Sequence, residues 1–338
     1  MKFNWKSAIG IALSVALLVW TLRDVSLAAV WVELERSNLP LFLASALAAT
    51  LIFPLRAIRW RIILEPVAPN LPLAPLWRSI AIGMMVNNLV PARAGEIARA
   101  YALTRETPVP FASSLASLAV DRLFDMVVLL GLGILATLDP SFPSGARVGG
   151  QTLGHLAQGS LVLVVLLVGG LYMLAIFPSQ LVRAFEIFAR KVSPAVEERG
   201  KNALLRFSAG LSVLKSPGRF ASVFTWTIAH WLMNALAFWL GFMAVGIHLG
   251  FAAALFLQLL IGIGVAVPSA PGFFGVFEKL ATVGLAIYAV SPTQATSWAI
   301  GFHILSFIPI TVIGIYYFSR LGLSFRELSA QSETPAQD

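Results

Sequence analysis

The chain has 338 residues, of which 58% are hydrophobic and only 12% are charged. Soluble domains carry roughly 25% charged residues, so this composition excludes a pair of soluble domains and predicts an all-α polytopic membrane protein. The net charge of +8 is typical of basic cytoplasmic loops that face anionic lipid. Because no basic run is interleaved with stacking aromatic residues, we expect no nucleic-acid partner.

A transmembrane helix needs about 20 mostly apolar residues. Six stretches reach or approach this length and predict full spans, namely 7–22, 38–55, 111–138, 156–177, 220–247 and 294–318. Lys2 and Lys6 precede the first stretch, which gives residues 1–28 some features of a signal peptide. The apolar run is nevertheless long enough to remain in the membrane as an anchor.

Two further apolar stretches, over 73–105 and 251–290, are interrupted by helix-breaking residues. With the N-terminus in the cytoplasm, nineteen lysines and arginines face the cytoplasm and three face outside, provided that each broken stretch returns to the side it entered from. We therefore predict two re-entrant hairpins, the first entering from the cytoplasm and the second from outside. Both termini are then expected on the cytoplasmic side of the plasma membrane.

The order helix, helix, hairpin, helix occurs twice, from opposite sides of the membrane. Proline and glycine stand four residues apart in both hairpins, at Pro91 and Gly95 and again at Pro268 and Gly272. Broken helices at matching positions of two inverted halves are typical of secondary transporters. The pattern predicts an inverted repeat.

This repeat divides the chain into a first membrane unit over 1–138 and a second over 139–322. Within the second unit, residues 179–215 are basic and amphipathic, which predicts a helix on the cytoplasmic surface bound to anionic lipid. The polar tail over 323–338 is expected to be disordered.

The first hairpin carries the most polar side chains inside an apolar stretch. Its candidate binding residues are Asn87, Asn88, Pro91, Arg93, Gly95, Glu96 and Arg99. If a helix starts at Pro91, its free N–H groups and the neighbouring arginines form a natural phosphate site. Gly95 would let a backbone or a headgroup approach closely. The alternative is an ion-pair ladder of Arg93, Glu96 and Arg99 that only buries the hairpin.

The apolar stretch over 111–138 contains Asp121, Arg122 and Asp125. The two carboxylates are four residues apart, so they share one face of a helix. Charges within a bilayer need partners or water, and we expect Asp121 or Asp125 to pair with an arginine of the first hairpin. A role in proton or cation binding and a purely structural pairing both remain open.

The second hairpin contains Pro268, Pro271, Gly272, Gly275 and Glu278. This pattern predicts a flexible break followed by an acidic side chain, although the breakers would also serve a hairpin that merely needs room to turn.

Three other groups of polar residues have more ordinary interpretations. Arg56, Arg59 and Trp60 are expected to be interfacial anchors at a cytoplasmic helix end. His230 and His303 are expected to form hydrogen bonds between helices. The sequence has no P-loop and no common hydrolase motif, so we expect neither an enzyme nor a cofactor or metal site.

Three motifs together resemble the lysylphosphatidylglycerol synthase transmembrane family, whose members are also called flippase-like domain proteins. They are Asn88-x-x-Pro91-x-Arg93-x-Gly95-Glu96-x-x-Arg99, Asp121-Arg122-x-x-Asp125 and Pro268-x-x-Pro271-Gly272-x-x-Gly275-x-x-Glu278. The resemblance covers about residues 5–322 and includes the membrane half of the multiple peptide resistance factor, to which lipid translocation is assigned. About 16 residues follow position 322, so no soluble aminoacyl-transferring domain is expected.

The sequence departs from the family pattern at two places. The family usually has glutamate where this chain has Asp121, and often has glycine where this chain has Phe273. The first change shortens the reach of a carboxylate, and the second makes the hairpin break narrower and more apolar.

The resemblance implies a translocase for a phosphate-bearing lipid, either a phospholipid or a polyprenyl phosphate. Arg93, Arg99 and the helix start at Pro91 would hold the phosphate. Glu96, Asp125 and Glu278 would hold a cationic group, a coupling proton or the arginines. Two alternatives remain: an accessory subunit that docks a cell-envelope glycosyltransferase or lipid-modifying enzyme, and a membrane transferase whose Asp121 and Asp125 hold a divalent metal.

Overall fold

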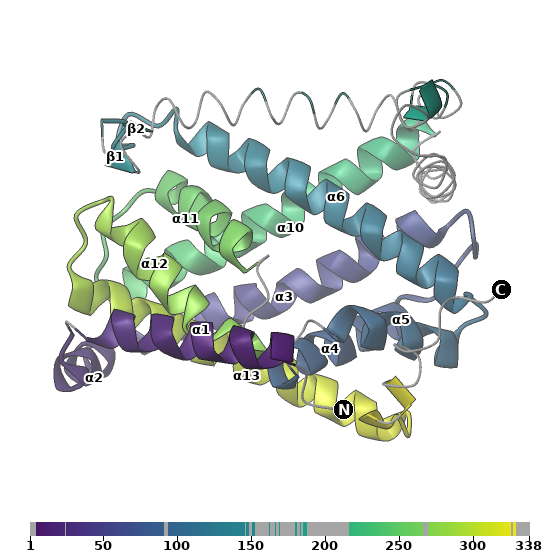
Figure 1. Cartoon of the computed structure of the whole chain (residues 1–338), viewed down its shortest axis with the longest axis horizontal. Helices are drawn as coiled ribbons and strands as arrows, with labels where there is room; N and C mark the ends of the chain where they lie inside the picture. The colour runs from purple at the N-terminus through teal and green to yellow at the C-terminus, as the bar shows by residue number, and fades with distance from the viewer. Residues whose placement is uncertain are drawn as a thin grey trace.

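The computed structural model describes residues 5–23, 25–90, 94–145, 147–148, 151–152, 216–265, 270–325 and 327–328, with isolated positions between 162 and 187. These residues are almost entirely helical (Figure 1). The predicted span at 156–177, the predicted surface helix at 179–215 and most of the predicted tail lie outside them. The strands β1 (Arg147–Val148) and β2 (Gln151–Thr152) form one short antiparallel pair.

The first half contains α1 (Trp5–Leu22), α2 (Leu27–Glu35), α3 (Leu39–Leu64), α4 (Leu73–Leu89), α5 (Gly95–Glu106) and α6 (Phe111–Ala136). The second half contains α10 (Pro217–Ala244), α11 (Phe251–Gly264), the 3₁₀ turn η2 (Pro271–Phe273), α12 (Val276–Ala286) and α13 (Pro292–Arg320). Polar caps set several starts. Asn38 accepts a hydrogen bond from the backbone of Leu41 at the start of α3, and Ser291 accepts one from Gln294 at the start of α13.

Three helices, α3, α10 and α13, are long and apolar enough to cross a membrane, and the pair α1 and α2, bent by 80°, adds a fourth candidate. The protein is therefore a multi-pass membrane protein. Helix α6 has 26 residues but carries the charged residues Asp121, Arg122 and Asp125. The prediction of six full spans is thus confirmed only in part. Helix α3 also continues beyond the predicted limit of residue 55, as far as Leu64.

Each of the two interrupted apolar stretches forms a pair of packed helices. In the first, α4 packs on α5, and a Cβ atom at Gly95 would overlap the carbonyl oxygen of Gly83. In the second, α11 packs on α12, and a Cβ atom at Gly264 would overlap the side chain of Leu280. Small residues bring the helix backbones close, which favours helix association in lipid, where burying apolar surface gives no gain.

The helix packing has a regular pattern. Helices α3 and α10 pack against each other, and α10 crosses α6 in the view of Figure 1. Helix α4 packs on α13 and α11 packs on α6, while α5 packs on α6 and α12 packs on α13. Exchanging α3 with α10, α4 with α11, α5 with α12 and α6 with α13 reproduces the same set of neighbours.

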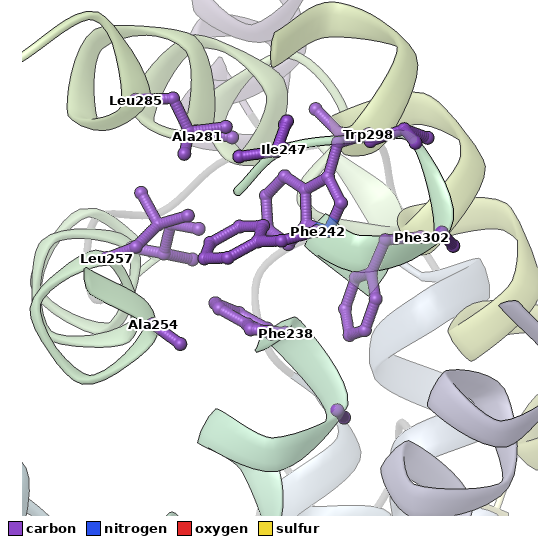
Figure 2. Close-up of a cluster of buried hydrophobic side chains, with 14 of the residues drawn as sticks. Phe238, Phe242, Ile247, Ala254, Leu257, Ala281, Leu285, Trp298 and Phe302 are labelled. Atoms are coloured by element: carbon purple, nitrogen blue, oxygen red, sulfur yellow. The ribbon is translucent and has the colours of Figure 1, made fainter. Parts of the chain in front are cut away.

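An aromatic cluster fills the space between α10 and α13. Figure 2 shows Phe238 and Phe242 of α10 facing Trp298 and Phe302 of α13. The ring centroids of Phe238 and Phe302 are 4.9 Å apart, as are those of Phe242 and Trp298. Each such pair contributes about 0.5–1.5 kcal/mol beyond its buried area, so the cluster holds one end of α10 firmly against α13.

Candidate functional site

A buried ion-pair network joins α3 to α6. The side chain of Arg59 has no exposed surface, and its Nη2 and Nη1 atoms lie 2.5 Å from Asp121 Oδ1 and 2.6 Å from Asp125 Oδ1. Its Nη1 also donates to Thr227 Oγ1 of α10 at 3.2 Å. Because Arg59 binds both carboxylates, Asp121 and Asp125 are held by a cation of the protein itself.

The first hairpin joins the same network. Arg99 of α5 donates from Nη1 to Asp121 Oδ2 at 3.1 Å, and its guanidinium carbon lies 3.9 Å from the centre of the Trp60 ring. The predicted pairing of Asp121 with an arginine of the first hairpin is confirmed. Trp60 in turn donates to Ser117 Oγ of α6 at 2.7 Å.

The interpretation of Arg56, Arg59 and Trp60 as interfacial anchors is wrong. All three side chains are buried in the protein. The reason is that α3 runs on to Leu64, which places these residues among α5, α6 and α10 instead of at a helix end.

Two members of the expected ion-pair ladder, Glu96 and Arg99, each pair with a residue of α6. Glu96 Oε1 accepts from Arg122 Nε of α6 at 2.8 Å, while Arg99 bonds to Asp121. Helix α5 begins at Gly95, so the expected helix start at Pro91 is four residues too early. Pro91 and Arg93 themselves lie outside the described residues.

Asn87 and Asn88 have separate structural roles. Asn87 Oδ1 accepts a hydrogen bond from the backbone N–H of Gly95 at 2.9 Å, which ties the end of α4 to the start of α5. Asn88 Nδ2 donates to Thr311 Oγ1 of α13 at 2.7 Å. The close backbone approach that Gly95 was expected to permit is that of Gly83. These contacts fix the first hairpin against the second half.

A cavity of about 280 Å3 lies between the two halves. Its walls come from α3, α4, α10, α11, α12, η2 and α13 and are mostly apolar. The polar side chains that line it are Arg56, Asn88, His230, Trp231, Asn234, Gln258, His303 and Ser306. We call it the central cavity. An apolar hollow with a few convergent polar groups is the usual form of a ligand site.

Three residues that line the central cavity each have a buried polar atom without a hydrogen bond to the described residues. Arg56 Nε, Gln258 Nε2 and His230 Nδ1 are buried and have no hydrogen bond to any residue that the structure describes. Arg56 lies 3.7 Å from Asp121 Oδ2, too far for a hydrogen bond. An unsatisfied buried donor costs about 1–3 kcal/mol, more when it is charged, so this cavity is suited to acceptor atoms such as phosphate oxygens.

A second, smaller hollow adjoins the central cavity through Arg56. It is lined by Arg56, Ile80, Gly83, Met84, Asn87, Gly95, Glu96, Arg99 and Arg122. Arg99 leaves its Nε and Nη2 atoms without acceptors among the described residues. Four candidates of the first hairpin and one of α6 thus meet around one basic hollow, namely Asn87, Gly95, Glu96, Arg99 and Arg122. Arg56 lines both this hollow and the central cavity.

The second hairpin is closed by a hydrogen-bonded triad. Glu278 Oε2 accepts from the backbone N–H of Gly275 at 2.6 Å, and Glu278 Oε1 lies 2.6 Å from His303 Nδ1. His303 Nε2 donates to the carbonyl oxygen of Gly272 at 2.8 Å, which confirms the expected interhelical hydrogen bonding of His303. Pro271 opens the turn η2, and Pro268 lies outside the described residues.

The break of this hairpin requires left-handed backbone. Gly272, Phe273 and Gly275 have φ values of 65°, 62° and 85°. Only the bulky Phe273 is disfavoured in this region, and it stands where the family resemblance expects glycine. Helix α1 covers the break, because Ser14 Oγ accepts from the backbone of Ala270 at 2.8 Å.

The sequence interpretation missed Arg56, Gln258 and His230 as site residues. A signal for Arg56 was present, since an ionisable side chain within an apolar helix is a functional candidate by default. His230 was predicted to form a hydrogen bond between helices and not to line a site, and Gln258 gave no signal, because its importance depends on the cavity between helices that are distant in the sequence. No group of three or more His, Asp or Glu side chains suited to a metal ion occurs within the described ranges.

Comparisons with known proteins identify relatives of the chain. The chain is 28% identical to the Glycosyltransferase AglD of Haloferax volcanii over 80% of its own length but only 47% of that protein. It is 24% identical to a UPF0104 membrane protein of Methanothermobacter thermautotrophicus, with 94% and 93% of the two chains covered, and 22% identical to one of Methanocaldococcus jannaschii, with 70% and 93% covered. Residues 7–314 match the model of the lysylphosphatidylglycerol synthase TM region. The chain belongs to the lysylphosphatidylglycerol synthase TM region family.

Proposed function

We propose that the protein moves a phosphate-bearing lipid between the leaflets of the plasma membrane by alternating access of two inverted halves. The observation that carries the proposal is the buried guanidinium of Arg56, whose Nε lacks an acceptor and which lines the central cavity. A lipid phosphate would supply the missing acceptor and a compensating charge.

The local charge balance supports an anionic ligand. Among the described residues around Arg56, four arginines (Arg56, Arg59, Arg99, Arg122) face three carboxylates (Glu96, Asp121, Asp125). The excess of positive charge in a membrane interior favours an anion. Gln258 and His230 add neutral polar contacts, and the apolar walls suit the glycerol or prenyl portion next to the phosphate.

The packing of the helices supports the proposed movement. Among the eight helices α3–α6 and α10–α13, the set of neighbours is unchanged when each is exchanged with its counterpart in the other half, as an inverted repeat over 1–138 and 139–322 requires. We propose that both hairpins are re-entrant and end at the central cavity, where Asn88 and Gly272 form part of the wall. Rocking of one half against the other at the α3–α10 contact would open the cavity to each leaflet in turn.

The remaining predicted site residues have proposed roles around this path. Arg99 would meet the phosphate in the smaller hollow before Arg56 does, and Asp121 and Asp125 would hold the arginines in place. The roles of Pro91, Arg93 and Pro268 rest on the sequence alone. Since Arg59 occupies both aspartates, the transferase alternative with a divalent metal at Asp121 and Asp125 has no support in this geometry.

The proposal is tested with purified protein in vesicles that carry a fluorescent phospholipid or polyprenyl phosphate in one leaflet. Arg56→Gln should slow lipid transfer by about tenfold or more, because a hydrogen bond to a charged group is worth about 1.5–3 kcal/mol. Arg61→Gln, five residues further along α3, is the matched control and should leave the rate unchanged. Equal rates for the parent and Arg56→Gln would refute the proposal.

A second candidate function is that of an accessory subunit for a cell-envelope glycosyltransferase. It is favoured by the similarity to AglD, which covers 80% of this chain. This role predicts a co-purifying envelope enzyme and vesicles in which the parent protein moves none of the tested lipids. Lipid transfer that depends on Arg56 would exclude it as the sole function.

A further inference from the structure

We propose that Glu278 and His303 share one exchangeable proton and that this proton is the coupling ion of the transporter. The proposal rests on the proposed lipid translocation. Glu278 belongs to α12 and His303 to α13, and both side chains are buried beside the central cavity. His303 itself lines that cavity.

The hydrogen bonds determine how many protons the pair holds. The carbonyl oxygen of Gly272 can only accept, so His303 Nε2 must carry hydrogen in the 2.8 Å bond. The 2.6 Å contact between His303 Nδ1 and Glu278 Oε1 then requires one further proton between them. The pair is either an imidazolium with a carboxylate or a neutral imidazole with a carboxylic acid, and its net charge is zero in both cases.

Loss of this proton breaks one of the two hydrogen bonds of His303. A neutral imidazole carries one N–H, which donates either to Glu278 or to the Gly272 carbonyl, and the pair then carries an uncompensated negative charge in an apolar wall. The proton would pass to water in the central cavity, which His303 lines. Two acceptors are left facing each other, either Nδ1 and Glu278 Oε1 between α12 and α13 or Nε2 and the Gly272 carbonyl at η2.

This contact also secures the break of the second hairpin. Glu278 accepts from the backbone of Gly275, and His303 holds the carbonyl of Gly272, so two residues close both sides of the turn η2. The rings of Phe274 and Phe277 lie 4.4 Å and 4.6 Å from the His303 ring, between centroids, and cover it. Release of the proton would therefore free the turn that forms one wall of the cavity.

Few other charges face the pair. From α3 and α10, Arg56 and His230 line the same cavity, and from α12 itself Lys279 turns away to lie 3.8 Å from the Trp20 ring of α1. On the other helices packed against α13, Arg78 of α4 is bonded to Glu106, and α2 carries Glu33 and Glu35. Helix α11 has no ionisable side chain. Among the described residues, Glu278 and His303 are therefore the acid–base pair that joins the second hairpin to α13.

The substitution Glu278→Gln removes the exchangeable proton and keeps the hydrogen bonds. A glutamine amide can donate to His303 Nδ1 while its oxygen accepts from Gly275 N–H, so it reproduces the protonated glutamate without an exchangeable proton. The chain has no cysteine, so the alkylation of one introduced cysteine is measured without a contribution from native thiols. Ser306 is suitable, because it lines the central cavity one helical turn after His303.

The experiment compares Ser306→Cys with Ser306→Cys/Glu278→Gln by alkylation with a water-soluble maleimide, over roughly pH 5 to 9. At each pH, dividing the rate for Ser306→Cys by the rate for the double variant cancels the effect of thiol ionisation, which is common to both. We expect this ratio to rise by about tenfold as the pH rises, because only the variant with Glu278 opens when the proton leaves. A constant ratio would overturn the proposal. If the double variant fails to fold, Ser306→Cys/His303→Gln replaces it with the same expected rise.

A second measurement separates this proposal from lipid translocation itself. The Glu278→Gln variant should retain the bound lipid that the Arg56→Gln variant loses. In vesicles, however, its rate of lipid transfer should no longer change with an imposed pH difference. If transfer by Glu278→Gln still follows the pH difference, the coupling proton lies elsewhere and the translocase proposal stands. If the parent transfers no lipid while the alkylation ratio rises, the proton site stands and the translocase proposal fails.

Discussion

The buried network at Arg59 allows a quantitative prediction about stability. Replacement of Arg59 by methionine keeps the aliphatic stem but removes the guanidinium that binds Asp121 and Asp125 at 2.5 Å and 2.6 Å. Removing one partner of a buried ion pair costs about 3–5 kcal/mol, because the other charge stays buried without compensation. Asp121 keeps Arg99 at 3.1 Å, which limits the loss, whereas among the described residues Asp125 keeps only Arg122, at 3.7 Å, as an arginine partner.

The matched control is Arg122→Met. Arg122 also pairs with a carboxylate, that of Glu96 at 2.8 Å, but the two side chains are 47% and 36% exposed. A partly exposed pair contributes less than a buried one, so this variant should be destabilised less than Arg59→Met. Denaturant unfolding of the detergent-solubilised proteins, followed by tryptophan fluorescence, measures the difference. Equal destabilisation by the two substitutions would refute the view that the Arg59 network holds α3, α6 and α10 together.

Glycine positions provide two further predictions. Gly95→Ala should destabilise the protein by about 1–3 kcal/mol, because its methyl group would overlap the Gly83 carbonyl, whereas Gly131→Ala has open space around it and should be neutral or slightly stabilising. Gly275→Ala should be more harmful than Gly322→Ala, since both have positive φ but only the first meets a backbone, that of Ser14. Thermal unfolding in detergent tests both pairs, and equal losses within either pair would contradict the packing described here.

Local signals predicted where the apolar stretches break. Proline and glycine inside apolar stretches mark such breaks, so the interruptions between α4 and α5 and between α11 and α12 were predicted, as was the pairing of Asp121 with an arginine of α5. The end of α3 was misjudged because a tryptophan between arginines is a common pattern at membrane interfaces. Nothing in the local sequence shows that α3 is surrounded by other helices at Arg59.

The central cavity could not be predicted in the same way. Its polar side chains come from residues that are far apart in the chain, such as Arg56, His230 and Gln258. Only the packing of α10 against both α3 and α11 shows that they line one hollow. The helix start at Pro91 failed for a local reason, since Asn87 caps the backbone of Gly95 and α5 begins there.

The most direct test of the central claim is the lipid that the purified protein retains. Gentle purification of the parent, Arg56→Gln and Arg61→Gln, followed by mass spectrometry of bound lipids, compares the cavity arginine with a neighbour on the same helix. We predict that one phospholipid or polyprenyl phosphate is enriched in the parent and in Arg61→Gln and is lost in Arg56→Gln. The same lipid content in all three proteins would contradict a phosphate site at Arg56.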